Sequence, residues 1–278
     1  MRPFKKIIFF TGIVLLGINI FGLFKTLRNP EIYTEQNTKR VSDITIKYPN
    51  IKEQLKRKVT ETDKEFAVRV TNVVADGILH YWDEKSGMTS ISINKAMTKY
   101  NERVPVWENY LLWLPYAFNS KKYKGYEFSN YKKNLERGIG LCSTASIVLK
   151  GVLNDNGIDA SLWDLAGHVV TRAQVDKEKN EWWILDADYG AIVVPYDTAA
   201  IEANPEIVRP AYATLASKYK PNAPSPYTTD KVVNIYGKEG NHIYTMDGGY
   251  ESFTYWAIWI IPIVLILPYS LYLIKRKK

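Results

Sequence analysis

The sequence predicts an α+β domain that is flanked by two membrane-spanning helices. Two observations support this fold class. An apolar run stands near each end of the chain, and between the runs segments of helical periodicity precede several short β-like segments. Helices followed by consecutive strands are typical of a domain in which helices pack on an antiparallel sheet. The 278 residues are enough for one medium-sized domain with such appendages.

The first apolar run, residues 7–24, has no charged residue and is about as long as a helix that crosses a bilayer. Basic residues precede it in a short N-terminus, residues 1–6. A cleaved signal peptide is the alternative, and it requires small residues at the cleavage site. Because the run ends in Gly22, Leu23 and Phe24, we expect an uncleaved signal anchor.

The second apolar run, residues 255–274, is also uncharged, with tryptophan near one end and tyrosine near the other. Such aromatic residues are typical of membrane interfaces. Basic residues at 275–278 follow it, so both extreme termini are basic and are expected in the cytoplasm. The sequence therefore predicts a two-pass protein of the cytoplasmic (inner) membrane. Its domain would lie on the periplasmic or extracellular side, with the lipid bilayer as a partner.

The formal net charge of +8 is explained by this topology. Seven of these excess cations lie at the two extreme ends, so the rest of the chain is nearly neutral. The sequence shows no basic stripe and no recognition motif for nucleic acid, so we expect no nucleic-acid partner.

Three segments are expected between the two spans. They are a tether over residues 25–58, a domain over 59–230 and a juxtamembrane segment over 231–254.

Helical patterns dominate the first half of the expected domain. Thr62 and Glu65 have the spacing of a capping box, which predicts the start of an amphipathic helix over residues 63–82. A second helix, rich in tryptophan and leucine, is expected over 104–118 and is assigned to the core. A third is expected over 142–153.

Short strands are expected after the third helix. Residues 204–229 contain several prolines and little periodicity, which predicts a long loop. The expected strands cover residues 160–165, 168–175, 182–185 and 191–194.

Cys142 is the only cysteine in the chain, so an internal disulfide is excluded. A buried apolar residue, an intermolecular disulfide and a nucleophile remain as interpretations. Gly138 and Gly140 precede Cys142, which should lie in the first turn of its helix. Unpaired N–H groups and the positive end of the helix dipole stabilise a thiolate there. This position favours the nucleophile.

A cysteine nucleophile requires a base and a group that orients the base. Of the three histidines, His168 begins an expected strand beside the cysteine helix, whereas His80 and His242 are interpreted as structural or exposed. Asp186 ends the apolar strand that forms a hairpin with the His168 strand. Asp188 is a rival for the orienting role.

The blocks Gly-Leu-Cys142, Gly-His168-Val and Trp-Trp-Ile-Leu-Asp186, in this order, resemble the transglutaminase-like core, which is part of the papain-like fold. The resemblance covers residues 63–195. It implies Cys142 as nucleophile, His168 as general base and acid, and Asp186 as the orienting residue. It also implies attack on an amide or peptide carbonyl through a thioester, followed by hydrolysis or acyl transfer, with a substrate outside the cytoplasm.

Stabilisation of the oxyanion requires hydrogen-bond donors. The backbone N–H of Cys142 is one expected donor, and Asn109 and Trp113 are candidates for the second. Neither a metal-ligand spacing nor a phosphate-binding loop is visible, so we expect no cofactor. The alternative from another functional class is a non-catalytic, membrane-tethered domain. It would bind a peptide or a partner, such as a membrane or envelope protein.

Overall fold

The computed structural model describes residues 2–34, 44–48, 50–81, 93–123, 125–213 and 229–277. The chain forms two compact units, which we call the helical unit and the α+β unit. The helical unit comprises Met1–Leu27, Asn101–Tyr126 and Asp247–Lys278, and the α+β unit comprises Arg28–Tyr100 and Glu127–Met246.

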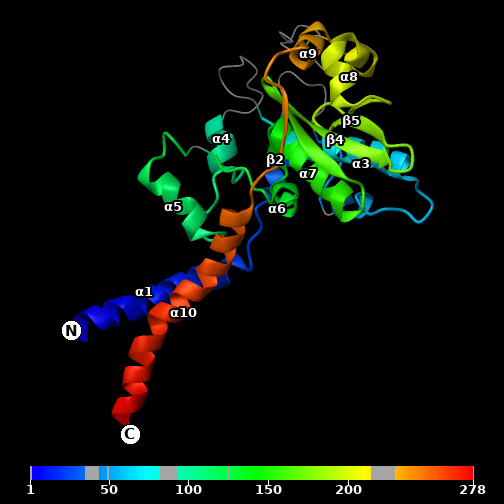
Figure 1. The fold of residues 1–278 in the computed structure, drawn as a ribbon. Helices are drawn as coiled ribbons and strands as arrows, with labels where there is room; N and C mark the ends of the chain where they lie inside the picture. The colour runs from blue at the N-terminus through cyan, green and yellow to red at the C-terminus, as the bar shows by residue number, and fades with distance from the viewer. Residues whose placement is uncertain are drawn as a thin grey trace. The chain divides into compact units, whose positions relative to one another are not determined.

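The helical unit contains the two expected apolar helices. Helix α1 (Arg2–Gly22, blue) and helix α10 (Gly249–Lys277, orange to red) lie side by side (Figure 1). Both are long and apolar enough to cross a membrane. The helices approach closely at Gly12, where an added Cβ would lie 2.8 Å from the Ile266 side chain.

Pro262 lies inside α10 and is accommodated by side chains from outside that helix. Proline has no N–H, so the carbonyl of Ile258, four residues earlier, loses its helical donor. The Asn19 amide donates to this carbonyl at 2.5 Å, and the Tyr110 hydroxyl donates to it at 3.1 Å. Asn19 is buried although it lies in an apolar helix, because its polar group satisfies a backbone group that proline has left without a donor.

The aromatic segment expected over residues 104–118 forms helix α5 (Tyr110–Phe118). It belongs to the helical unit and contacts α10. Its placement in the core of a 59–230 domain was therefore wrong. Hydrogen bonds tie the segment to α10: Asn109 donates to Thr254 at 3.0 Å, and the Tyr255 hydroxyl donates to Glu108 at 2.6 Å.

The α+β unit is built on a five-stranded antiparallel sheet in the order β6-β5-β4-β3-β7. The expected α+β class and antiparallel sheet are confirmed. The strands are β3 (Ala160–Leu165), β4 (His168–Asp176), β5 (Glu181–Asp186), β6 (Ala191–Val193) and β7 (His242–Tyr244). Strand β7 comes from the segment expected to be juxtamembrane, so the domain continues beyond residue 230.

Helices α3 (Asp63–Gly77) and α7 (Cys142–Asp155) contact the sheet (Figure 1). The Thr62–Glu65 capping box is present, as expected. Helix α3 ends before residue 82, because Ile78 is already extended and leads into β1 (Leu79–His80), which pairs in parallel with β2 (Ile139–Gly140). Residue 82 lies outside the described residues.

The central strands of the sheet are buried on both faces. Trp183 and Leu185 of β5 belong to the core cluster shared with α3 and α7, whereas Ile184 belongs to a second cluster. That cluster includes residues of α8 (Thr198–Ala203), the 3-10 helix η3 (Pro205–Tyr212) and α9 (Thr229–Tyr236). Burial on both faces explains why β5 is a continuous apolar run and does not alternate.

Two expected connections have more structure than predicted. Residues 205–212, assigned to a loop, form η3, while residues 214–228 lie outside the described part of the chain. In the expected tether, Ile51 of α2 (Asn50–Gln54) and Leu55 are buried in the main core. The remaining described helices are η1 (Pro30–Thr34), α4 (Ile93–Thr98) and α6 (Tyr131–Arg137).

Candidate active site

Cys142 is the first residue of α7 and is partly exposed. Strand β2 runs almost directly into this helix, and a Cβ at Gly140 would overlap the Thr144 side chain. Glycine is therefore required for the tight approach of the backbone to the first turn. The position of Cys142 at the helix N-terminus, expected from the sequence, is confirmed.

His168 is the first residue of β4 and is only 4% exposed. It follows a two-residue turn, Ala166-Gly167, because Leu165 and His168 are register partners in the β3–β4 hairpin. Gly167 has φ +100°, a backbone conformation that favours glycine. The turn fixes the start of β4 and thereby the position of the imidazole.

Asp186 is the last residue of β5, and its Oδ2 lies 2.7 Å from Nε2 of His168. Its Oδ1 accepts hydrogen bonds from the backbone N–H groups of Asp188, at 2.9 Å, and Tyr189, at 3.2 Å. The Tyr212 hydroxyl donates to Oδ2 at 2.7 Å. This set of donors satisfies the hydrogen-bonding capacity of a carboxylate that is only 1% exposed.

The three expected site residues lie together: His168 contacts Asp186, and the Cys142 thiol is near enough to His168 to raise its pKa. When Nε2 of His168 donates to Oδ2 of Asp186, Nδ1 is the ring nitrogen that is left to accept the thiol proton of Cys142. Burial by itself lowers the pKa of His168. The charge and hydrogen bond of Asp186, together with Cys142, outweigh burial and raise that pKa well above its ordinary value. The charged imidazolium is therefore favoured.

The choice between Asp186 and Asp188 is made by contacts with the two buried histidines. Oδ1 of Asp188 lies 2.5 Å from Nδ1 of His80, and both side chains are buried. Asp186 is thus the partner of His168, and Asp188 is the partner of His80. His242 lies exposed on β7, in agreement with one of the two interpretations given for it.

Two residues of the site were missed from the sequence. Tyr212 and Tyr236 are fully buried, and their hydroxyls lie 2.8 Å apart. The pKa of each tyrosine is raised well above its ordinary value, mainly by burial and to a smaller extent by the charge of Asp186. Tyrosine is common in cores, and no local pattern in η3 or α9 distinguishes these two.

The candidates for the second oxyanion donor lie in the helical unit. The Asn109 oxygen caps α5 by accepting from the N–H groups of Leu111 and Leu112, and its amide donates to Thr254. This side chain therefore has a structural role at the start of α5. Trp113 belongs to the same helix, and its role as a donor stays a prediction.

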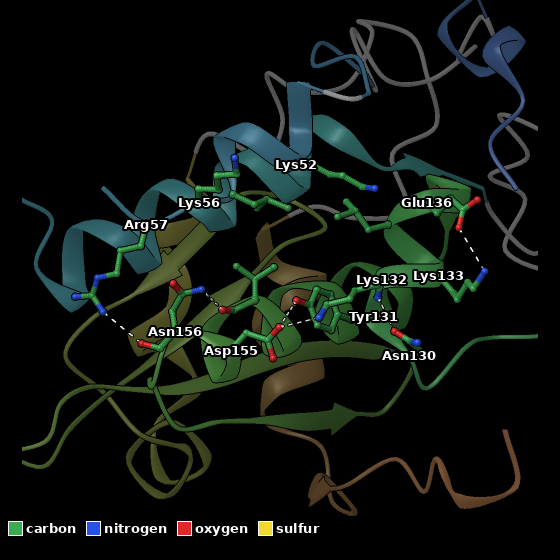
Figure 2. A pocket seen from close by; sticks show the side chains of 13 residues that line it. Lys52, Lys56, Arg57, Asn130, Tyr131, Lys132, Lys133, Glu136, Asp155 and Asn156 are labelled. Carbon is green, nitrogen blue, oxygen red and sulfur yellow. Dashed lines mark hydrogen bonds and ion pairs between the residues drawn. The ribbon is translucent and has the colours of Figure 1, made fainter. Parts of the chain in front are cut away.

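A cavity of about 540 Å³ lies apart from the triad, between α2, α6 and the end of α7 (Figure 2). Its cations are largely neutralised. Lysine and arginine side chains form the ion pairs Lys56–Glu53, Arg57–Asp63, Lys132–Asp155 and Lys133–Glu136. Lys52 lies 4.7 Å from the centre of the Tyr48 ring.

Among the residues that the structure describes, no group of three His, Cys, Asp or Glu side chains is arranged to hold a metal ion. The expectation that no cofactor is required stays a prediction. Comparison of the chain with known protein families, with curated proteins and with solved structures gave no match.

Proposed function

We propose that this chain is a membrane-anchored cysteine enzyme of transglutaminase-like type, with a papain-like core, that attacks an amide or peptide carbonyl. The observation that supports this proposal is the grouping of Cys142, His168 and Asp186, in which Nε2 of His168 lies 2.7 Å from Oδ2 of Asp186. Its members come from the start of a helix and from two adjacent strands. A partly exposed thiol, a buried imidazole and a buried carboxylate correspond to nucleophile, base and orienting group.

The reaction begins with transfer of the thiol proton from Cys142 to His168. The thiolate attacks the carbonyl carbon, a C–S bond forms, and the π electrons move to the oxygen. The N–H of Cys142 is a donor to that oxyanion. His168 then protonates the leaving nitrogen as the C–N bond breaks, which leaves a thioester. Water or an amine then attacks the thioester carbonyl while His168 removes a proton from the attacking molecule. The C–S bond breaks, and the proton held by His168 returns to the sulfur of Cys142.

Location restricts the substrate. With both basic termini in the cytoplasm, the two apolar helices would place the α+β unit outside the cytoplasmic membrane. An enzyme there would meet peptides and amides of the cell envelope or of exported proteins. Whether water or an amine accepts the acyl group depends on access to the thioester.

The test is the rate of iodoacetamide labelling of Cys142 against pH, in the full chain in detergent. The lone cysteine makes the signal specific. The ordinary pKa of a thiol is about 8.5. We expect wild-type labelling to remain rapid well below that pH. In His168→Ala we expect the labelling rate at the same low pH to fall sharply. His242→Ala, which alters an exposed histidine, is the matched control.

Slow labelling of the folded wild-type chain at every pH below 8 would contradict the proposal. The non-catalytic peptide- or partner-binding domain would then be the better interpretation. Circular dichroism of each variant separates loss of activation from loss of the fold.

A further inference from the structure

The Asp186 carboxylate is part of a hydrogen-bonded series that extends beyond the triad. The Tyr212 hydroxyl donates to Oδ2 of Asp186 at 2.7 Å, and the Tyr236 hydroxyl lies 2.8 Å from that of Tyr212. Tyr212 is 1% exposed and Tyr236 is 0% exposed. These residues come from η3 and α9, which are separated from β5 in sequence.

The direction of the hydrogen bonds follows from counting protons. A tyrosine hydroxyl has one hydrogen, and that of Tyr212 is directed to the carboxylate, which can only accept. Tyr236 must therefore donate to the Tyr212 oxygen. A hydroxyl that accepts a hydrogen bond becomes a stronger donor, so Tyr236 strengthens the bond between Tyr212 and Asp186.

The rings of the two tyrosines lie in apolar surroundings. The Tyr236 ring lies 5.5 Å from the Trp163 ring, and Val208 and Val232 belong to the same core cluster. When one of these hydroxyls is removed, side chains such as Val208 and Val232 offer no other hydrogen-bond donor in its place. The effect of its removal should therefore reach Asp186 undiminished by solvent.

Tyr212 and His168 share one oxygen of Asp186. The hydroxyl withdraws negative charge from Oδ2, and this charge is what stabilises the imidazolium. We propose that Tyr212, supported by Tyr236, is a positioning residue that limits the attraction of Asp186 for the His168 imidazolium. The proposal rests on the proposed function because it concerns the same triad, but its test does not require catalysis.

The groups that face His168 define what a pH titration would report. They are the Cys142 thiol from α7, the Asp186 carboxylate from β5, the Tyr189 ring 5.4 Å away and, through Asp186, the hydroxyls of Tyr212 and Tyr236. Burial and then Asp186 hold the pKa values of Tyr212 and Tyr236 well above the ordinary range. Their own ionisation therefore stays outside a titration of His168.

The experiment is an NMR titration of the full chain in detergent with isotope-labelled histidine, in which His168→Gln assigns the His168 signal. We expect Tyr212→Phe to raise the midpoint of His168 by roughly half a pH unit or more, and Tyr236→Phe to raise it by less. Tyr131→Phe is the matched control. It removes a 2.6 Å hydrogen bond to Asp155 at the opposite end of α7.

An unchanged or lowered midpoint in Tyr212→Phe, relative to Tyr131→Phe, would overturn the proposal. If Tyr212→Phe does not fold, an unchanged midpoint in Tyr236→Phe would overturn it equally. Alkylation of Cys142, measured in parallel, separates the two hypotheses. Slow alkylation of Cys142 in the wild-type chain would contradict the proposed enzyme. The titration of His168 would still decide the role of Tyr212.

Discussion

Nε2 of His168 lies 2.7 Å from Oδ2 of Asp186, across two antiparallel strands. His168 begins β4 and Asp186 ends β5, so the antiparallel arrangement brings both to the same end of the sheet. Of the two neighbouring aspartates, Asp186 and Asp188, this contact makes Asp186 the partner of the His168 imidazole. The other member, Asp188, contacts His80.

We predict that Asp186→Asn reduces the iodoacetamide labelling rate of Cys142 at pH 6 by roughly tenfold or more, because the imidazolium loses its counter-charge. Asp188→Asn should reduce the rate far less, since it removes the partner of His80. Equal effects of the two variants, both still folded, would contradict the assignment of Asp186.

Stability should depend on pH through His168. Its pKa is raised in the folded chain, so its contribution is fully present below the unfolded pKa of about 6.5 and is lost as pH rises through the folded pKa. We predict that the melting temperatures of wild type and His168→Gln differ most near pH 6 and converge at alkaline pH. Thermal unfolding followed by tryptophan fluorescence measures this, and a difference that grows with pH would be the wrong sign.

Two glycines with positive φ should respond differently to alanine. Gly167 has φ +100° and open space around its Cβ position, so Gly167→Ala should cost about 1–2 kcal/mol from backbone strain. Gly138 has φ +69°, and its Cβ would overlap the Arg28 guanidinium, which donates to the carbonyls of Leu135 and Glu136. Denaturant titration should therefore show a larger loss for Gly138→Ala. The reverse order would contradict this account.

The polar residue in α1 should matter because of a proline in α10. We predict that Asn19→Leu destabilises the helical unit by about 1 kcal/mol, since the Ile258 carbonyl loses a donor. In a Pro262→Ala background, an N–H is restored four residues after Ile258. The cost of Asn19→Leu should then fall, and a double-mutant cycle of thermal unfolding in detergent measures the coupling. Strict additivity would show that the proline and Asn19 act independently.

Local patterns predicted much of the architecture. The Thr62–Glu65 capping box, the helix that begins at Cys142 and the hairpin of the His168 and Asp186 strands depend on residues close in sequence, and all are present. The apolar spans were predicted for the same reason. In α1 the helix ends at Gly22, two residues before the expected end of the run.

The sequence by itself determined the order Cys142, His168, Asp186 and the elements that carry them, because helix starts, turns and strand ends have local signals. Tertiary structure alone decided which aspartate contacts His168, placed α5 with α10, and brought Tyr212 and Tyr236 to the triad. These outcomes depend on hydrogen bonds between segments far apart in the chain. Such bonds leave no periodicity in the sequence, since their energy depends on burial and geometry that arise only when the segments pack together.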